Sequence, residues 1–202
     1  ALGRSREESV ADLAQLEFGV RSDQPGTIVR DFQSERSFDG RKVMPLSHRY
    51  YLADAKFLVA LGGDEGLLHQ LDAALRSPRW PLYLGRRSCP PDASLSRGVR
   101  EEYATVREAL EAEPWIASEW YRRKHGEVPA LEIACDAHDG EPCVSQADYP
   151  LEFSLTTRRY ACRPVYRYST PNPDVASACR TASVGESVAF VADADADPFS
   201  FM

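Results

Sequence analysis

A chain of 202 residues with 43% hydrophobic and 27% charged side chains is long enough to bury a core, which argues against a disordered segment. No apolar run approaches the roughly 20 residues that a membrane-spanning helix needs, and no secretory signal is recognisable, so we expect a cytoplasmic protein without membrane contact. The five cysteines are irregularly spaced, which favours reduced thiols over a disulfide framework.

The net charge of −7 argues against nucleic-acid binding, since a basic surface normally supplies the affinity. The distribution of charge weakens that argument. Residues 76–107 carry seven basic and three acidic side chains, residues 158–180 carry five and one, and residues 21–50 carry six and four. Residues 108–157 carry three basic and eleven acidic side chains. Local basic surfaces are therefore compatible with the acidic total, although ordinary surface variation would produce the same segregation.

The first residues resemble the end of a helix rather than the start of a domain. Ala1-Leu2-Gly3 is typical of a helix stopped by a glycine, so we expect the first strand and most of the first helix to precede Ala1. Ser5 and Glu8 form a capping-box pattern, and apolar residues follow at helical spacing. This pattern predicts a short helix over residues 6–16.

A strand and a polar insert come next. Phe18 and Val20 alternate with other residues, which predicts a strand, and residues 23–26 predict a turn after it. Residues 27–49 are polar, with Asp39-Gly40 as a hairpin-tip signal. Because the flanks of this insert are only weakly apolar, we expect a projecting hairpin or a mobile loop rather than a pair of core strands.

The clearest strand of the sequence is the alternating pattern over residues 50–61, which ends at Gly62-Gly63. Residues 64–76 place four leucines on one helical face, and Pro78 closes that helix. Residues 80–84 predict a short apolar strand.

With one strand before Ala1, the order of elements becomes βαββαβ. This is the α+β, ferredoxin-like (RRM-like) order of RNA-recognition domains. We assign residues 1–95 to such a domain, with a β-hairpin inserted at about 27–49, and residues 96–202 to a C-terminal extension that packs on it. For the extension we expect a helix, acidic loops, a strand and a flexible acidic tail, over residues 99–112, 113–150, 158–168 and about 192–202.

The run from Tyr83 to Pro90 carries the most suggestive chemistry. Gly85 permits a close backbone approach, Arg86 and Arg87 can fork onto phosphates or stack on bases, and Ser88 can donate to a phosphate. By chemistry alone, this run supports only an anion-binding strand end.

Two patterns resemble metal sites without completing one. Cys135, His138 and Cys143 lack a second ligand pair at a suitable distance, so we expect no zinc site. Asp193, Asp195 and Asp197 alternate with alanine, but the glycine and glutamate of a calcium loop are missing. We expect neither a metal nor a cofactor.

The Leu84–Pro90 string belongs to a wider match over about residues 1–95. The residues that carry it are Ala1-Leu2-Gly3, Phe18-Gly19-Val20-Arg21, Asp23, Arg30-Asp31-Phe32-Gln33, Tyr50-Tyr51-Leu52-Ala53-Asp54-Ala55 with Phe57, and Pro78-Arg79-Trp80-Pro81 through Pro90. Through them the chain resembles the five-type Cas proteins, the CasD subunits of the type I-E CRISPR surveillance complex Cascade.

This resemblance implies a non-catalytic subunit that binds the repeat-derived 5′ handle of the guide crRNA and caps the backbone of the complex in antiviral defence. It implies a backbone subunit and a large subunit as partners, with target DNA reached through the complex. Residues 27–49 fall where such proteins carry a β-hairpin thumb. The residues we expect to bind RNA are Arg21, Arg30, Phe32, Arg36, Arg41, Lys42, Met44, Tyr50, Arg86, Arg87 and Ser88.

Two alternatives remain open at this point. The first is a metal-independent endoribonuclease that processes CRISPR repeat RNA, for which His48 beside Arg49 and Tyr50 is the best candidate cluster. The resemblance speaks against it, since type I-E complexes have a separate processing endonuclease. The second is a protein-interaction domain that uses the acidic residues 108–157.

Overall fold

The computed structural model describes residues 1–5, 7–87, 89–91, 95–126, 128–153, 158–176 and 188–192. Its elements are, in chain order, η1 (Leu13–Gln15), β1 (Glu17–Gln33), β2 (Ser47–Gly62), α1 (Glu65–Arg76), β3 (Ser96–Arg100), α2 (Val106–Ala112), α3 (Glu119–His125), β4 (Ala130–Asp136), β5 (Val144–Phe153), β6 (Arg158–Pro171), α4 (Pro173–Ala176) and β7 (Val188–Ala192). No described helix is both long and apolar enough to cross a membrane.

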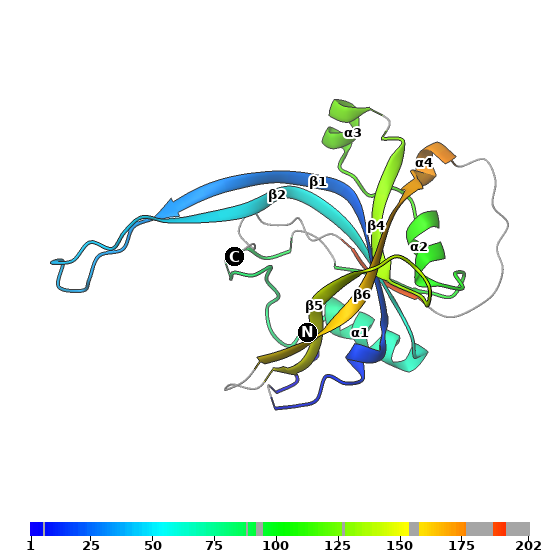
Figure 1. Ribbon diagram of the computed structural model, residues 1–202, viewed down its shortest axis with the longest axis horizontal. Helices are drawn as coiled ribbons and strands as arrows, with labels where there is room; N and C mark the ends of the chain where they lie inside the picture. Colours follow the sequence, from blue (N-terminus) through cyan, green and yellow to red (C-terminus); the bar gives the residue numbers. More distant parts are fainter. Residues whose placement is uncertain are drawn as a thin grey trace.

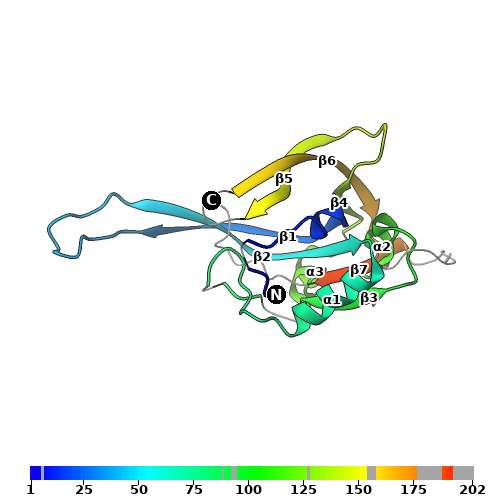
Figure 2. The same cartoon turned by 90° about the horizontal axis from the view of Figure 1, so that it is seen from below.

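The described strands form one sheet in the order β3-β7-β2-β1-β4-β6-β5, and every neighbouring pair is antiparallel. Figure 2 shows the β5–β6 hairpin and the group of α1, β3 and β7 on opposite sides of the central β1–β2 ribbon. The fold is therefore α+β and consistent with a ferredoxin-like, RRM-like domain. The sheet crosses the predicted boundary at residue 95, because β4 and β7 flank β1 and β2 directly.

The core lies between the sheet and α2, and two glycines let the helix approach closely. A Cβ atom on Gly19 would lie 2.7 Å from Leu110 Cδ1 and 2.8 Å from Val106 Cγ1, and one on Gly62 would lie 2.8 Å from Val106 Cγ2. The buried residues of this cluster are Leu58, Ala60, Val106, Ala109, Leu110, Ile133 and Cys135. Because this layer is packed so tightly, it fixes the segment that follows α2 against β1.

A β-bulge between Ser22 and Gln24 interrupts the ladder of β1 and β2. Around it lies a buried ion pair: Arg21 Nε donates to Asp23 Oδ1 at 2.7 Å and Arg21 Nη2 donates to Asp23 Oδ2 at 2.8 Å, with both side chains fully buried. The remaining donors of the guanidinium bond carbonyl oxygens at the end of α2 and just after it, those of Leu110, Glu113 and Pro114. The ion pair therefore ties β1 to that segment.

The same bulge holds the next stretch of chain through its acceptors. Asp23 accepts from the backbone N–H of Ile116 at 2.8 Å, and its carbonyl oxygen accepts from Trp115 Nε1 at 2.8 Å. Gln24 Oε1 accepts from both the N–H and the hydroxyl of Ser118 at 3.0 Å. Hydrogen bonds thus hold several positions of residues 110–118 against the bulge. They pair polar groups that burial would otherwise leave without a partner.

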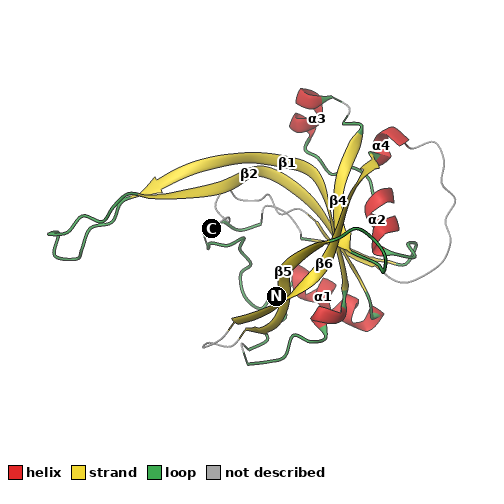
Figure 3. Ribbon diagram, viewed as in Figure 1, coloured by secondary structure: helices red, strands yellow, loops and turns green. Residues whose placement is uncertain are grey.

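Beyond the bulge, β1 and β2 leave the body of the protein as a long curved hairpin (Figures 1 and 3). We call residues 27–53 the arm. At its root, Gly26 has a φ of +72°, and a Cβ there would lie 2.6 Å from the carbonyl oxygen of Ala53, while Asp54 has a φ of +55°. Strand pairing continues to Gln33 opposite Ser47. The predicted projecting hairpin is confirmed, and its flanks are paired strands.

Three expectations for the N-terminal half are wrong. A helix was expected over residues 6–16, but the described residues 7–16 contain only the short 3-10 helix η1, and Arg4 binds the Asp12 carboxylate across this segment. Residues 23–26 lie within β1 as the bulge instead of forming a turn. Residues 80–84 form no strand, and Pro81 removes a backbone donor within them.

The C-terminal half is more regular than its acidic composition predicts. The expected helix over 99–112 begins only at Val106, where Thr105 caps it, since residues 96–100 form β3. The expected acidic loops over 113–150 include α3, β4 and the start of β5. The strand expected over 158–168 is confirmed as β6. Residues 193–202 of the expected tail lie outside the described residues.

The buried ion pair generates a stability prediction. We expect Arg21→Met to lower the free energy of unfolding by about 3–5 kcal/mol, because it leaves the Asp23 carboxylate buried without its counter-charge. Adding Asp23→Leu to Arg21→Met recovers part of the loss. Urea unfolding followed by circular dichroism measures both, and a loss below about 1 kcal/mol for Arg21→Met would contradict this account.

Candidate nucleic-acid interface

The arm has two faces, and strand register decides which residues share each of them. Directly opposite residues of an antiparallel pair point to the same side, and so do alternate residues along a strand. The pairs Ile28–Leu52, Arg30–Tyr50 and Phe32–His48 therefore lie on one side, which we call the Phe32 face. Phe32 is 63% exposed and Tyr50 is 42% exposed, while Arg30 and His48 are exposed between them. This face presents two aromatic rings beside a cation.

The opposite side of the arm is covered at its root. Tyr51 lies there and is only 1% exposed. Arg86 Nη1 donates to the Tyr51 hydroxyl at 2.8 Å, and the Arg86 guanidinium lies 5.6 Å from the centre of the Tyr51 ring. Arg86 therefore fastens its own loop to the arm root, while Arg87 beside it is exposed.

The loop that carries Arg86 is a tight turn. The N–H of Leu84 donates to the carbonyl oxygen of Cys89 at 2.8 Å, and the N–H of Cys89 donates to the carbonyl oxygen of Arg86 at 3.0 Å. Gly85 adopts a φ of +77°, which favours glycine. Cys89 is buried beneath the turn. Ser88, a predicted contact, lies outside the described residues.

The tip of the arm is an ordered turn with exposed apolar side chains. The hydroxyl of Ser37 donates to Asp39 Oδ1, and the N–H of Gly40 donates to the carbonyl oxygen of Ser37 at 2.8 Å, as the Asp-Gly pattern predicts. The Ser37 hydroxyl and the N–H of Arg41 lower the pKa of Asp39. The exposed apolar residues near the tip are Phe38, Val43, Met44 and Leu46.

The structure gathers only part of the predicted RNA-binding set. Arg30, Phe32 and Tyr50 come together on the Phe32 face, and the predicted tip residues Arg36, Arg41, Lys42 and Met44 are all exposed at the end of the arm. Arg86 lies on the other side of the root. The prediction for Arg21 is wrong, because this arginine is fully buried and its guanidinium is saturated by Asp23 and backbone carbonyls.

Sequence reasoning missed two members of the Phe32 face. Ile28 is highly exposed and Leu52 is opposite it in the ladder, so the pair extends the aromatic surface toward the root. The signal was the register itself: a hairpin centred on Asp39-Gly40 sets Ile28 against Leu52. Exposed apolar side chains that lie together, here Ile28 and Phe32, are typical of interaction surfaces.

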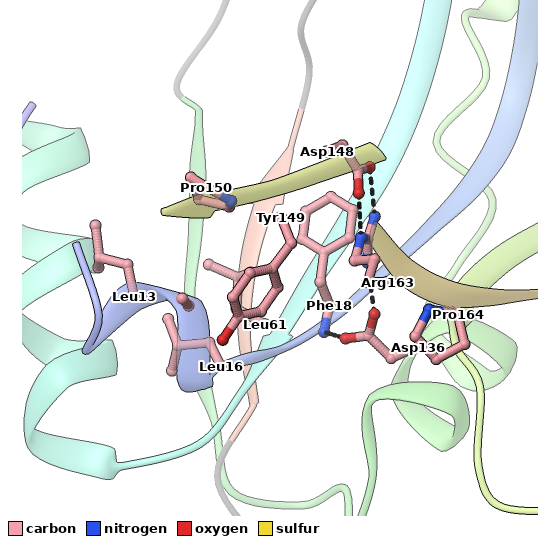
Figure 4. A pocket seen from close by; sticks show the side chains of 11 residues that line it. Leu13, Leu16, Phe18, Leu61, Asp136, Asp148, Tyr149, Pro150, Arg163 and Pro164 are labelled. Atoms are coloured by element: carbon pink, nitrogen blue, oxygen red, sulfur yellow. Dashed lines mark hydrogen bonds and ion pairs between the residues drawn. The ribbon is translucent and has the colours of Figure 1, made fainter. Parts of the chain in front are cut away.

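A pocket of about 480 Å³ lies at the opposite end of the sheet, between η1 and the β5–β6 hairpin (Figure 4). Its walls are mostly apolar, with Leu13, Leu16 and Phe18 among them. Arg163, which also lines the pocket, is already paired with two carboxylates. Its Nε donates to Asp148 Oδ1 at 2.7 Å and its Nη1 donates to Asp136 Oδ1 at 2.5 Å, and these bonds raise the pKa of Arg163. These ion pairs link β4, β5 and β6 at the edge of the sheet and leave the pocket little free charge for a nucleic acid.

The described residues contain no group of three or more His, Cys, Asp or Glu side chains that could hold a metal ion. Cys135 is buried in the core, where burial raises the pKa of its thiol. The N–H of His138 donates to Glu141, whose carboxylate also binds Arg107. That ion pair lowers the pKa of Glu141 to about 2. These groups are therefore engaged in holding a turn.

Comparison with known proteins adds the remaining evidence. The family described as "CRISPR-associated protein (Cas_Cas5)" matches residues 1–166. A solved structure described as "Crystal structure of Cas protein" is 36% identical, over 85% of this chain and 75% of that chain, with a TM-score of 0.62. Another, described as "CRISPR RNA-guided surveillance complex", is 28% identical, over 86% and 75%, with a TM-score of 0.62. No curated protein matches the chain.

The tip of the arm should be dispensable for folding. We expect that joining Gln33 to Ser47 through an Asn-Gly turn, which removes residues 34–46, leaves the free energy of unfolding within about 0.5 kcal/mol of the parent, since the removed side chains are mostly exposed. Thermal unfolding tests this. A loss of several kcal/mol would mean that the tip contributes to the core.

Substitutions of Arg86 and of Arg87 should differ in their effect on stability. We expect Arg86→Ala to destabilise the fold by about 1–2 kcal/mol, because it removes the hydrogen bond and the cation–π contact to Tyr51. Arg87→Ala, its matched control, leaves stability unchanged because the side chain is exposed. Chemical unfolding of both variants measures the difference, and equal stabilities would contradict the assignment.

Proposed function

Because the chain belongs to the CRISPR-associated Cas5 family, we propose that it is a non-catalytic subunit of an RNA-guided surveillance complex and binds the 5′ handle of the guide RNA with its arm. The observation that carries the proposal is the Phe32 face. Two exposed aromatic rings beside an exposed arginine form a platform for single-stranded RNA, since each ring can stack on a base and the cation can meet a phosphate.

The geometry of the arm suits this role. Phe32 and Tyr50 are diagonal neighbours across the strand pair, roughly 7–8 Å apart at their backbones. Both belong to paired strands, which hold their positions better than a mobile loop would. Stacking each ring on a base is worth about 1–3 kcal/mol, and the pair can therefore dominate affinity for the handle.

The tip suggests a second element of the function. Phe38 and Met44 are exposed at the far end of the arm, beside Arg41 and Lys42. We assign the tip to a wedge against the guide RNA beneath the adjacent backbone subunit. Inserting an apolar group between stacked bases costs a few kcal/mol per step, and contacts along the arm offset that cost.

The family and the sequence resemblance to type I-E subunits support a wider assignment. The protein caps one end of a cytoplasmic Cascade complex in antiviral defence and contacts its backbone and large subunits. Target DNA is reached only through the assembled complex. A neighbouring solved structure carries the description "CRISPR RNA-guided surveillance complex", which supports this placement.

The non-catalytic part of the proposal rests on His48. It lies on the Phe32 face next to exposed side chains, and within the described part of the chain no hydrogen bond or ion pair orients its ring. A general base for RNA cleavage needs a fixed position and a partner that sets its tautomer. The Phe32 face thus has the chemistry of a binding surface.

The aromatic pair provides the direct test. We expect Phe32→Ala with Tyr50→Ala to weaken binding of the 5′-handle RNA by at least about fivefold, the low end for losing one stacked base. Tyr160→Ala, which removes a similarly exposed tyrosine from β6, is the matched control. Fluorescence anisotropy with labelled handle RNA measures affinity, and unchanged binding by the double variant would refute the proposed site.

Catalysis is tested separately. Incubating the purified protein with CRISPR repeat RNA in EDTA should yield no cleavage product, and His48→Ala should behave identically. A product that appears with the parent and disappears with His48→Ala would establish the endoribonuclease alternative instead.

A further inference from the structure

Basic charge is concentrated in one place within the acidic part of the chain. Residues 108–157 contain three Lys and Arg side chains, and these are Arg122, Arg123 and Lys124, consecutive residues of α3. They are followed by His125 in the same last turn. Basic residues at a helix C-terminus complement the helix dipole, and that alone would explain their sign. The arrangement of the side chains on α3 indicates an additional role.

The residues of α3 divide into an inner and an outer set. Tyr121 and Arg122 face inward: Tyr121 makes an edge-on contact with Trp115, and the Arg122 guanidinium lies 4.7 Å from the Trp115 ring centre. Arg122 Nη1 also donates to Asp174 Oδ2 at 2.7 Å. These contacts hold the helix on the body and leave its other side free.

The outer set consists of Trp120, Arg123 and Lys124, which we call the α3 patch. They are spaced i, i+3 and i+4 and therefore share one side of the helix. Trp120 is 52% exposed, and Lys124 Nζ lies 4.8 Å from the centre of its ring. Among the described residues, neither Arg123 nor Lys124 has an acidic partner. An exposed indole beside two exposed cations has no role in the packing of the body.

The α3 patch is fixed to the root of the arm. Ser118 caps α3 by accepting from the N–H of Tyr121 at 3.2 Å, and its own N–H and hydroxyl both donate to Gln24 Oε1 at 3.0 Å. Gln24 Nε2 in turn donates to the carbonyl oxygen of Asp54 on β2 at 2.6 Å. The helix therefore keeps a set position relative to the strands from which the arm projects.

The patch also lies on the side of the sheet that leads to the Phe32 face. No register shift follows Gln24, so Gln24, Ile28 and Phe32 all point to one side of β1. Figure 1 shows α3 beside the root of the arm. A strand of RNA that follows the Phe32 face toward the body is thereby directed to the helix.

We infer that the α3 patch is a second contact for single-stranded RNA, with a base stacked on Trp120 and phosphates held by Arg123 and Lys124. The inference rests on the proposed function, because it extends the track of the Phe32 face. Indole stacking combined with two flanking cations is the composition of single-strand binding surfaces.

The test uses the full chain and two single-stranded RNAs of about 4 and about 16 nucleotides, the range of typical site sizes. The variants are Trp120→Ala and Arg123→Gln with Lys124→Gln. The matched control, Arg158→Gln with Arg159→Gln, removes the same charge from exposed positions of β6. We expect each α3 variant to bind the long RNA at least about fivefold more weakly and the short RNA normally. Losing two phosphate contacts lowers the salt slope by about 1.4.

The outcomes separate the two claims. If the α3 variants match the control while Phe32→Ala with Tyr50→Ala weakens both RNAs, the α3 patch is refuted and the proposed function stands. If the α3 variants weaken the long RNA and the arm variant weakens neither, the patch stands and the proposed arm site fails. Normal RNA affinity with impaired assembly of the complex would overturn the inference in favour of a protein contact.

Discussion

The buried pair of Arg21 and Asp23 is the interaction on which the architecture depends. Its two charges are removed from water in the middle of a strand, at a cost that only complete pairing offsets. Pairing is complete because the segment after α2 supplies carbonyls to the arginine and N–H groups to the aspartate. One ion pair thus specifies how the two halves of the chain meet. It also places the bulge, and with it the point where the arm begins.

The arm shows how the body positions an exposed aromatic surface. One of its sides is committed at the root, where Arg86 holds Tyr51, and the other carries the exposed pair of Phe32 and Tyr50. Because alternate residues face opposite ways, the same two strands are anchored through one set of side chains and available through the other. The Phe32 face therefore inherits the rigidity of the ladder without taking part in the core.

Much of this was predictable where a local pattern decided the structure. The alternation over residues 50–61 and the Asp39-Gly40 tip gave β2 and the hairpin, and the leucine spacing gave α1. The failures have a common cause in tertiary contacts. Arg21 looks like a surface cation until the carbonyls that saturate it are known, and the apolar residues 80–84 read as a strand although they form a loop. The pair of Arg30 and Tyr50 needed the register, which a hairpin tip supplies, whereas the link from Ser118 to Gln24 spans 94 residues and leaves no local signal.

The strict two-residue alternation of the arm has a consequence for how such a protein can change. A single inserted or deleted residue in either strand between Gly26 and the tip would rotate everything beyond it by half a turn and carry the aromatic rings to the wrong side. The length of each strand can therefore change without moving the rings to the other side only by two residues at a time. The pleat of the two strands thus sets the step by which the arm can lengthen or shorten.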